Sequence, residues 1–374
     1  MTTCDFLVIG GGVIGLSIAR DLRRRQPNAR IILIEKESSC GAHASGRNSG
    51  VLHAGFYYSP DSLKAKFTRL GNEQLTAYCE EKGIPLNKCG KLVVAKDAGD
   101  LKSLDELFRR GQANGIELQE LTDTEAKKIE PRVRTYQRAL FSPRTSTVNP
   151  LHVVNAMQED AQREGVQILV GTAYVGKDER RVRTNKDRIE AGYVVNAAGL
   201  YADKIALEYG FSQQYRILPF KGLYLYSNEP PGSFRTNIYP VPDLRNPFLG
   251  VHFTITADGK AKIGPTAIPA FWRENYEGFD NFKLGELIEV AGRGLGLLTA
   301  AQFDYRRLAV EEISKYSRSK MVSLASVLAE GVAEKNYQKW GRPGIRAQLL
   351  DITKKKLEMD FVLEGDQATE ALNY

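Results

Sequence analysis

The stretch Phe6-Leu7-Val8-Ile9-Gly10-Gly11-Gly12-Val13-Ile14-Gly15 decides the fold of this chain. Its first four residues form an apolar run that predicts a buried parallel strand, and the glycines follow at once. Gly10 permits a tight turn, Gly12 lets the backbone approach a pyrophosphate, and Gly15 allows the next helix to pack close to the strand. That helix is expected from about Val13 to Arg25, and the N–H groups at its start are free to bind phosphates. The order of strand, glycine turn and helix predicts a dinucleotide-binding domain.

The acidic residue of this fingerprint follows a second strand. Ile31-Ile32-Leu33-Ile34 is again apolar, and Glu35 comes directly after it, twenty residues beyond Gly15. A carboxylate at this place accepts hydrogen bonds from a ribose diol and favours a ribose without a 2′-phosphate. A chance cluster of glycines would lack the strands, the helix and the acid in this order, so the context supports dinucleotide binding.

The residues after Glu35 distinguish FAD from NAD. In a simple NAD enzyme the chain would return soon to a third strand, whereas here it runs through small residues from Gly41 to Gly50, with Arg47 and Asn48 among them. Such a stretch suits close passage along an extended cofactor, and an ordinary surface loop is the alternative. The sequence therefore favours FAD.

The segment Ser45–Tyr58, Ser-Gly-Arg-Asn-Ser-Gly-Val-Leu-His-Ala-Gly-Phe-Tyr-Tyr, carries a resemblance to a known family. It resembles the flavin segment of the L-2-hydroxyglutarate dehydrogenases and oxidases, which belong to the D-amino-acid-oxidase-like FAD superfamily. The same resemblance recurs along nearly the whole chain, in Ser62–Lys66, Pro219–Tyr224, Ile238–Asp243, Pro247–Thr254, Gly264–Ala267 and Gly344–Gln348.

This resemblance implies a fold class and a domain organisation. The fold would be α/β with an α+β second domain: a Rossmann-like FAD-binding domain of the glutathione-reductase type, interleaved with an antiparallel-sheet substrate domain. We expect the FAD-binding domain to comprise residues 1–88, 149–215 and 335–374, and the substrate domain to comprise residues 89–148 and 216–334.

The resemblance also implies an activity. This activity is the oxidation of a small dicarboxylate, L-2-hydroxyglutarate, to 2-oxoglutarate by hydride transfer to flavin N5, with electrons passed to dioxygen, a quinone or another carrier. The alternatives are an FAD oxidase of a small amino acid or of another 2-hydroxy acid, and a flavin-binding protein with impaired activity. The last is considered because the family pattern continues past Phe361–Asp366 to a helix whose start points at the flavin, while this sequence ends at Tyr374. Without that helix dipole, FAD binding is expected to be weaker.

Residue patterns outside the fingerprint predict the remaining elements. Asn149 and Pro150 predict a capped helix that runs to about Glu164. From Pro219 to about Ala267 the chain is rich in Tyr, Phe and Val and broken by Pro and Gly, which predicts an antiparallel sheet facing the substrate. The stretch from Gly285 to Glu334 is predicted to be largely helical and to pack outside that sheet.

The expected cofactor-binding residues gather in the fingerprint and in the small-residue stretch after it. A further pair lies where a later strand, Tyr193 to Asn196, ends in small residues and returns to the FAD domain. These residues are Gly10, Gly12, Gly15, Glu35, Ser45, Arg47, Asn48, Ser49, Gly50, Ala198 and Gly199. We expect FAD to be bound without a covalent bond, although histidine can carry one and His53 lies near the expected ring.

Three residues are candidates for catalysis. His53, in the flavin segment, and His252, in the predicted sheet, are the base candidates, because imidazole accepts a proton near neutral pH. The sequence does not choose between them, and the alternatives are a His53 that only hydrogen-bonds the cofactor and a His252 that only orients the substrate. Lys221 is expected on a strand that meets the flavin in related oxidases, where a lysine promotes reaction with oxygen. An exposed lysine beside a glycine is the alternative there.

The substrate carboxylates need a cationic or polar partner. Arg346 is the first candidate, because the planar guanidinium binds a carboxylate through two hydrogen bonds. Tyr239 and Tyr57 are further candidates, and packing within a sheet is the alternative for both tyrosines.

Composition limits the class of protein. The 374 residues, 42% of them hydrophobic, suffice for two cores, and the sequence shows neither a signal peptide nor a transmembrane segment. We therefore expect a cytoplasmic protein. The net charge of +7 is interpreted foremost as charged side chains on solvated surfaces. The alternatives are steering of an anionic substrate and peripheral attachment to the inner face of the cell membrane. No nucleic-acid motif is present. No metal site is expected from four scattered cysteines, Cys4, Cys40, Cys79 and Cys89.

Overall fold

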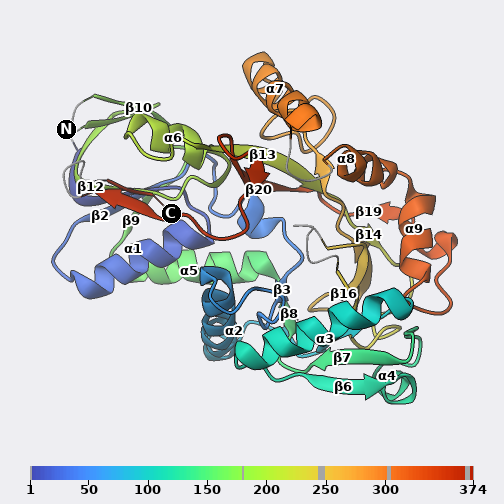
Figure 1. Ribbon diagram of the computed structural model, residues 1–374. Helices are drawn as coiled ribbons and strands as arrows, with labels where there is room; N and C mark the ends of the chain where they lie inside the picture. Colours follow the sequence, from blue (N-terminus) through green and yellow to red (C-terminus); the bar gives the residue numbers. More distant parts are fainter. Residues whose placement is uncertain (1, 179–180, 243–248, 301–304, 367–370, 374) are drawn as a thin grey trace.

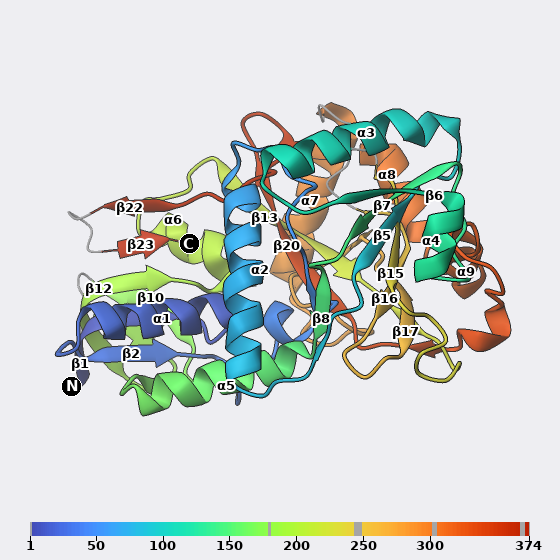
Figure 2. The same ribbon diagram turned by 90° about the horizontal axis from the view of Figure 1, so that it is seen from below.

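The computed structural model describes residues 2–178, 181–242, 249–300, 305–366 and 371–373 (Figure 1). Asp243, Pro247 and Phe248, which belong to the segments of family resemblance, lie outside these ranges. One half of the molecule is built on a mainly parallel sheet and the other on a mixed sheet (Figure 2).

The parallel sheet begins with the predicted strand, helix and strand. β1 (Thr2–Ile9), α1 (Val13–Arg25) and β2 (Ile31–Ile34) are confirmed at their expected places. β1 lies between β2 and β12, and the apolar side chains of β1 and β2 are buried, as strands covered on both faces require. β9 and β23 extend the sheet in parallel on its two sides, while a hairpin strand adds an antiparallel edge at the start of β12. The additional strands are β9 (Gln167–Leu169), β10 (Tyr174–Asp178), β11 (Arg181–Thr184), β12 (Arg188–Asn196), β22 (Glu364–Asp366) and β23 (Ala371–Asn373).

Helices cover both faces of the parallel sheet. α1 and α5 (Pro150–Arg163) form a core with one face, and α6 (Ala202–Glu208) packs on the other. The predicted cap of α5 is confirmed, because the Asn149 side chain accepts a hydrogen bond from the Leu151 N–H at 3.0 Å. Short 3-10 turns connect the sheet to the rest of the chain at η1 (Ala44–Gly46) and η2 (Gly199–Tyr201).

The mixed sheet has the order β19-β14-β17-β16-β15-β5-β7-β6. The strands of the stretch predicted to form an antiparallel sheet, β14 to β17, pair antiparallel, as expected, and β15 in addition pairs with β5 in parallel. Parallel neighbours need a long connection, and the chain between β5 and β15 passes through the other half of the molecule. The strands are β5 (Lys91–Val94), β6 (Gln119–Thr122), β7 (Arg138–Ser142), β14 (Leu225–Tyr226), β15 (Asn237–Pro240), β16 (His252–Ile255), β17 (Ala261–Gly264) and β19 (Lys339–Trp340).

Alternation along these strands gives the mixed sheet two different faces. Leu92, Ile238, Phe253 and Ile263 point to one side, where they form the largest apolar core with α4 (Asp123–Ile129) and α9 (Arg318–Ser326). The residues between them point to the opposite side of the sheet, and this side carries several polar side chains. α2 (Leu63–Glu81) runs between the two halves, and α3 (Ala98–Ala113) lies along the mixed sheet (Figure 2).

Two smaller sheets connect the halves. One has the order β18-β13-β20-β21, in which β13 pairs with β20 from Tyr215 to Gly222. The other has the order β3-β8-β4. The strands are β3 (Val51–Leu52), β4 (Leu86–Asn87), β8 (Ser146–Val148), β13 (Tyr215–Gly222), β18 (Ile268–Pro269), β20 (Gly344–Asp351) and β21 (Lys356–Leu357).

The strand pairing bears on the interleaved division of the chain. β19 and β20, from the range 335–374, pair with β14 and β13, from the range 216–334, whereas β23 joins the parallel sheet beside β12. The division into an FAD-binding and a substrate domain remains a proposal, with β20 as the strand that runs from one to the other.

The stretch predicted to be largely helical contains α7 (Leu284–Ala300), α8 (Tyr305–Ser314), α9 and the 3-10 turn η3 (Glu334–Asn336). α7 contacts β13 and stands out from the body at the top of Figure 1. None of the helices in the described ranges is both long and apolar enough to span a bilayer.

Candidate active site

The turn between β1 and α1 packs tightly against the end of β12. Gly10 has a φ of +114°, and a β-carbon there would come closer than 3.0 Å to the Ala197 carbonyl oxygen. A β-carbon on Gly15 would clash in the same way with the Gly10 oxygen, so α1 can approach the turn only with glycine at this position. A β-carbon on Gly12 would meet only the Ser45 hydroxyl within 4 Å. The turn is therefore crowded at Gly10 and Gly15 and more open at Gly12.

Glu35 lies at the end of β2 with its carboxylate turned to the glycine turn. The carboxylate is buried and accepts hydrogen bonds from the backbone N–H groups of Gly11, at 2.7 Å, and Glu37, at 2.9 Å. Each carboxylate oxygen has two lone pairs, so these two bonds leave capacity for hydroxyl donors.

A cavity of about 780 Å³ follows the glycine turn. Ser45 holds the start of α1 beside it, since its hydroxyl accepts a hydrogen bond from the Val13 N–H at 3.0 Å. Seven of the expected cofactor residues line this cavity: Gly10, Gly12, Glu35, Ser45, Asn48, Ala198 and Gly199. The other four, Gly15, Arg47, Ser49 and Gly50, do not line it.

Arg47 acts within the protein in this structure. Its Nε donates to the Ala42 carbonyl at 2.8 Å, and its guanidinium lies 4.1 Å from the centre of the Tyr276 ring. Burial, followed by the charge of Arg342, lowers its pKa. Arg47 thus holds the small-residue stretch against the segment before α7.

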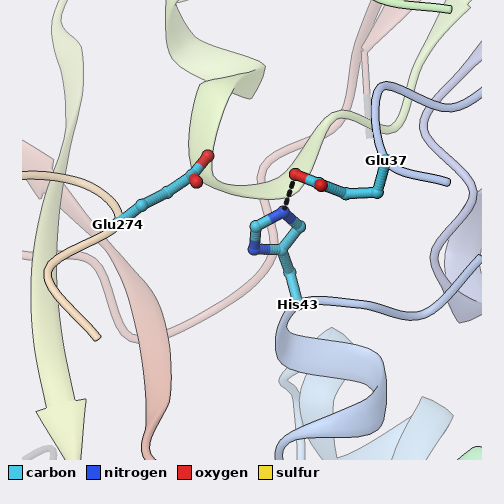
Figure 3. A group of neighbouring side chains, drawn as sticks. All are labelled: Glu37, His43 and Glu274. Atoms are coloured by element: carbon cyan, nitrogen blue, oxygen red, sulfur yellow. Dashed lines mark hydrogen bonds and ion pairs between the residues drawn. The ribbon is translucent and has the colours of Figure 1, made fainter. Parts of the chain in front are cut away.

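Glu37, His43 and Glu274 bring an imidazole and two carboxylates together at one wall of the cavity (Figure 3). His43 Nε2 lies 2.8 Å from the Glu37 carboxylate, and Nδ1 lies 2.7 Å from the Tyr276 hydroxyl. Lys36 forms ion pairs with both carboxylates. Such groups suit a metal ion, but both acids already form ion pairs with the single Lys36 ammonium. The sequence analysis missed this group, because Glu274 is far from the other two along the chain.

The two candidate bases lie together on the polar face of the mixed sheet. His252, on β16, stacks on the Tyr239 ring of β15 with the ring centres 3.6 Å apart. His53, which follows β3, meets the same ring edge-on at 6.2 Å. His53 is partly exposed, whereas His252 is buried and its Nδ1 donates to the Gly250 carbonyl at 2.8 Å. His53 is therefore the more accessible of the two.

Lys91 lies in the same cluster and was missed by the sequence analysis. It is fully buried, and its Nζ lies 3.4 Å from His53 Nδ1. The rings of Phe56, Tyr57 and Tyr239 surround the amine, with centres 4.5, 4.4 and 5.0 Å away. The sequence held a signal for this burial. Lys91 and Val93 are two residues apart in an apolar strand, so their side chains point to the same face of the sheet.

The electrostatics of this cluster favour neutral side chains. Burial lowers the pKa of Lys91 to about 7 and that of His252 to about 3. Burial also lowers the pKa of His53 well below its usual value, and the charges of Lys91 and His252 add to the shift. Burial raises the pKa of Tyr57 and Tyr239, so both hydroxyls stay protonated.

A second buried lysine lies on the same sheet face. Lys262, on β17, donates to the Ser49 carbonyl at 3.1 Å, and its Nζ lies 4.5 Å from the centre of the Tyr224 ring. Burial lowers its pKa to about 8. Lys91 and Lys262 are thus two buried amines on the face that carries the histidine cluster.

Arg346 and Lys221 lie on opposite faces of the β13–β20 pair, because Arg346 is opposite Phe220 and Lys221 opposite Ile345. Arg346 lies near Tyr58, where its charge counteracts the rise in the tyrosine's pKa that burial causes. Desolvation by the surrounding protein lowers the pKa of the Arg346 guanidinium, while part of the residue stays accessible to solvent.

Lys221 is buried and lines a second cavity of about 720 Å³. None of the lining residues of that cavity belongs to the histidine cluster. Of the six candidate catalytic and substrate residues, the structure thus brings four together: His53, His252, Tyr239 and Tyr57. Arg346 lies beside Tyr58, and Lys221 lies elsewhere.

Comparison with known families decides the class. The family model "DAO: FAD dependent oxidoreductase" matches residues 5–291. The chain belongs to this family of FAD-dependent oxidoreductases. Its fold class, its identity as an oxidoreductase and its cofactor FAD, all predicted from the sequence, are confirmed.

Curated relatives of this oxidoreductase align with most of its length. The mitochondrial L-2-hydroxyglutarate dehydrogenase of Nematostella vectensis is 36% identical over 96% of this chain and 82% of the relative. The mitochondrial human protein of that name is 35% identical over 96% and 81%. L-2-hydroxyglutarate dehydrogenase of Escherichia coli K12 is 35% identical over 96% and 85%. These relatives confirm the family resemblance seen in the sequence.

Solved structures confirm the fold of the oxidoreductase. L-α-glycerophosphate oxidase from Mycoplasma pneumoniae, with FAD bound, aligns with a TM-score of 0.75 at 23% identity, over 97% of this chain and 86% of that one. Glycine oxidase from Geobacillus kaustophilus aligns with a TM-score of 0.72 at 20% identity, over 100% and 89%.

The residues of the first cavity fit FAD. The open backbone at Gly12 lies at the start of α1, where N–H groups can bind a pyrophosphate, and Glu35 is at hand for a ribose. Gly199 has a φ of +53° and no atom within 4 Å of where its β-carbon would be, which leaves room for a ligand at this wall. We propose these residues as the FAD site.

Proposed function

We propose that this FAD-dependent oxidoreductase oxidises L-2-hydroxyglutarate to 2-oxoglutarate. The observation that carries the proposal is the histidine cluster on a sheet face that also holds two buried amines, Lys91 and Lys262. Lys262, with a pKa of about 8, is mostly an ammonium at neutral pH. A dicarboxylate substrate supplies the negative charge that such a site lacks, and the likeness to L-2-hydroxyglutarate dehydrogenases over nearly the whole chain supports this substrate.

The side chains divide the work of the reaction. In this proposal Arg346, which lies beside Tyr58, binds a substrate carboxylate through two hydrogen bonds. His53, partly exposed and neutral, takes the proton of the substrate hydroxyl. FAD, when bound, accepts the hydride from the substrate carbon.

An anaerobic spectrum of the purified, FAD-loaded protein tests the substrate. L-2-hydroxyglutarate is expected to bleach the flavin band rapidly, whereas its D-enantiomer and glycine are expected to leave it unchanged. Bleaching by glycine would instead favour an amino acid oxidase. A band that stays oxidised with L-2-hydroxyglutarate would contradict the proposal.

The electron acceptor is one of three classes, namely dioxygen, a quinone or a protein carrier. Reoxidation of the bleached protein by each of these decides among them, because the physiological acceptor should react fastest. A protein carrier or a quinone would make the enzyme a dehydrogenase, and dioxygen would make it an oxidase.

We propose in addition that α7 contacts an anionic membrane surface. Leu284, Ile288 and Leu295 lie on one side of this helix and are 62%, 65% and 64% exposed. Lys283 precedes them, and the chain carries a net charge of +7. Co-sedimentation with phosphatidylglycerol vesicles, but not with phosphatidylcholine vesicles, is expected, and Ile288→Glu should weaken it. Equal pelleting of the protein and this variant would contradict the contact.

A further inference from the structure

The Lys91 amine has few partners for a charged group. An ammonium has three N–H donors, and the structure shows a hydrogen bond from this amine to His53 Nδ1, at 3.4 Å. The other directions face the rings of Phe56, Tyr57 and Tyr239. No described carboxylate forms an ion pair with it.

Two effects on the charge of Lys91 oppose each other. The electron-rich ring faces stabilise an ammonium, and the complete loss of water disfavours it. Desolvation wins, since the pKa of Lys91 falls to about 7. Near neutral pH a large share of the side chain is a neutral amine, whose lone pair can accept a proton.

Lys91 cannot itself meet a substrate, because it is fully buried behind His53 and the rings. His53 is partly exposed and offers two nitrogens. Nδ1 is directed to Lys91, which leaves Nε2 for a ligand. His252 lacks this arrangement, because its Nδ1 is directed to the Gly250 carbonyl, which accepts and cannot take up a proton at neutral pH.

We propose that Lys91 is a positioning residue that receives, through His53, the proton lost by the substrate hydroxyl. The inference rests on the proposed function. In the step, the substrate O–H bond breaks as its proton goes to His53 Nε2, and the Nδ1 proton of His53 passes to the Lys91 nitrogen. The carbon–hydrogen bond breaks with its electron pair, which leaves as hydride to the FAD that the family supplies, and the C–O bond becomes a carbonyl. The substrate is oxidised by two electrons, His53 ends neutral, and Lys91 ends as an ammonium.

The other titratable groups around the pair do not compete for this proton. Tyr57, from the segment after His53, and Tyr239, from β15, stay protonated because burial raises their pKa. His252, from β16, has a pKa of about 3, and the charges that act on it are those of Lys91, Lys262 and Lys315. The latter two are also cations that oppose protonation of their neighbours.

Histidine tautomers give a test that needs no substrate. The chain has only four histidines, so ¹⁵N-histidine NMR of the FAD-loaded protein can resolve His53, which His53→Gln assigns. Above about pH 7, His53 is expected to carry its proton on Nδ1 and donate to the amine. As the pH falls and Lys91 becomes an ammonium, the proton should move to Nε2. A His53 tautomer that stays the same from pH 6 to pH 9 in the unaltered protein would overturn the proposal.

Kinetics of anaerobic flavin reduction test the role in catalysis. Lys91→Met is expected to slow reduction by about 100-fold, which is what loss of a general base costs, and to remove the fall in rate below about pH 7. Lys91→Arg keeps the charge and cannot accept a proton, so it should be equally slow. A Lys91→Arg protein with the rate and pH profile of the unaltered protein would overturn the proposal.

Lys262→Met serves as the matched variant, because it removes the other buried cation of this face and leaves the Lys91–His53 contact in place. It should keep the His53 tautomer change. FAD content and circular dichroism report whether each variant folds. An unaltered protein that shows the tautomer change but does not reduce its flavin with L-2-hydroxyglutarate would contradict the proposed function and leave the proton pair standing.

Discussion

The Glu35 carboxylate accepts a 2.7 Å hydrogen bond from the backbone N–H of Gly11, which ties the end of β2 to the glycine turn after β1. The acid of the fingerprint therefore has a structural part in addition to the ribose contact expected of it. It holds the turn in shape, and a turn already in shape binds its ligand at a lower cost in conformational entropy.

Replacing Glu35 by alanine should cost both stability and FAD. The Gly11 and Glu37 N–H groups would lose their acceptor, and a buried N–H without one costs about 1–3 kcal/mol. Glu35→Gln should lose less, because its amide oxygen can still accept from Gly11. Urea unfolding and FAD titration measure both effects, with the exposed Glu81→Gln as control. Full FAD affinity in Glu35→Ala would contradict the role given to this acid.

Gly344, at the start of β20, should not tolerate a side chain. A β-carbon there would lie closer than 3.0 Å to the Arg47 carbonyl oxygen, so the strand would have to move away from the small-residue stretch. We expect Gly344→Ala to destabilise the protein by about 1–3 kcal/mol, the usual cost of overpacking, and to release FAD. Thermal unfolding and the flavin to protein absorbance ratio give the measurement.

Gly292→Ala is the matched control for Gly344→Ala. Gly292 lies inside α7, and no atom lies within 4 Å of where its β-carbon would be. Alanine should therefore stabilise the helix by about 0.5–1 kcal/mol. Equal effects of the two substitutions would show that close approach of β20 to Arg47 does not matter.

The cofactor half of the molecule could be predicted from the sequence because its signals are local. The fingerprint places strand, turn, helix and acid within thirty-five residues, and the elements lie where the pattern put them. The parallel pairing of β5 with β15 could not be predicted in this way, because it joins strands that are far apart in the chain.

The catalytic cluster shows the same limit. The sequence offered His53 and His252 separately, and only the folded sheet shows that Tyr239 lies between their rings. The burial of Lys91 was missed because a single lysine at the start of an apolar strand is typical of a strand end exposed to solvent. Its meaning depends on the rings of Phe56 and Tyr57, which reach it from another segment.

Asp203 and Arg273 form a buried ion pair whose disruption should be costly. Arg273 has no exposed surface, and it bonds Asp203 on α6 at 2.7 Å and Glu289 on α7 at 2.9 Å. Asp203→Asn would leave the guanidinium without its buried partner, and such losses cost about 3–5 kcal/mol. Urea unfolding measures this loss. Lys204→Met, which removes a neighbouring exposed cation, should cost far less, and equal losses in the two variants would contradict the argument.

The acid limit of stability should depend on Glu289. Burial opposes ionisation of this carboxyl, but the hydrogen bond and charge of Arg273 prevail and lower its pKa to about 2 from an ordinary 4.5. Because the folded pKa lies below the unfolded one, the stabilisation is complete above about pH 4.5 and is lost as the pH falls toward 2. Urea unfolding at a series of pH values should therefore show a free energy of unfolding that falls more steeply over this window in the unaltered protein than in Glu289→Gln. Parallel curves for the two proteins would mean that Arg273 does not hold Glu289 ionised in the folded protein.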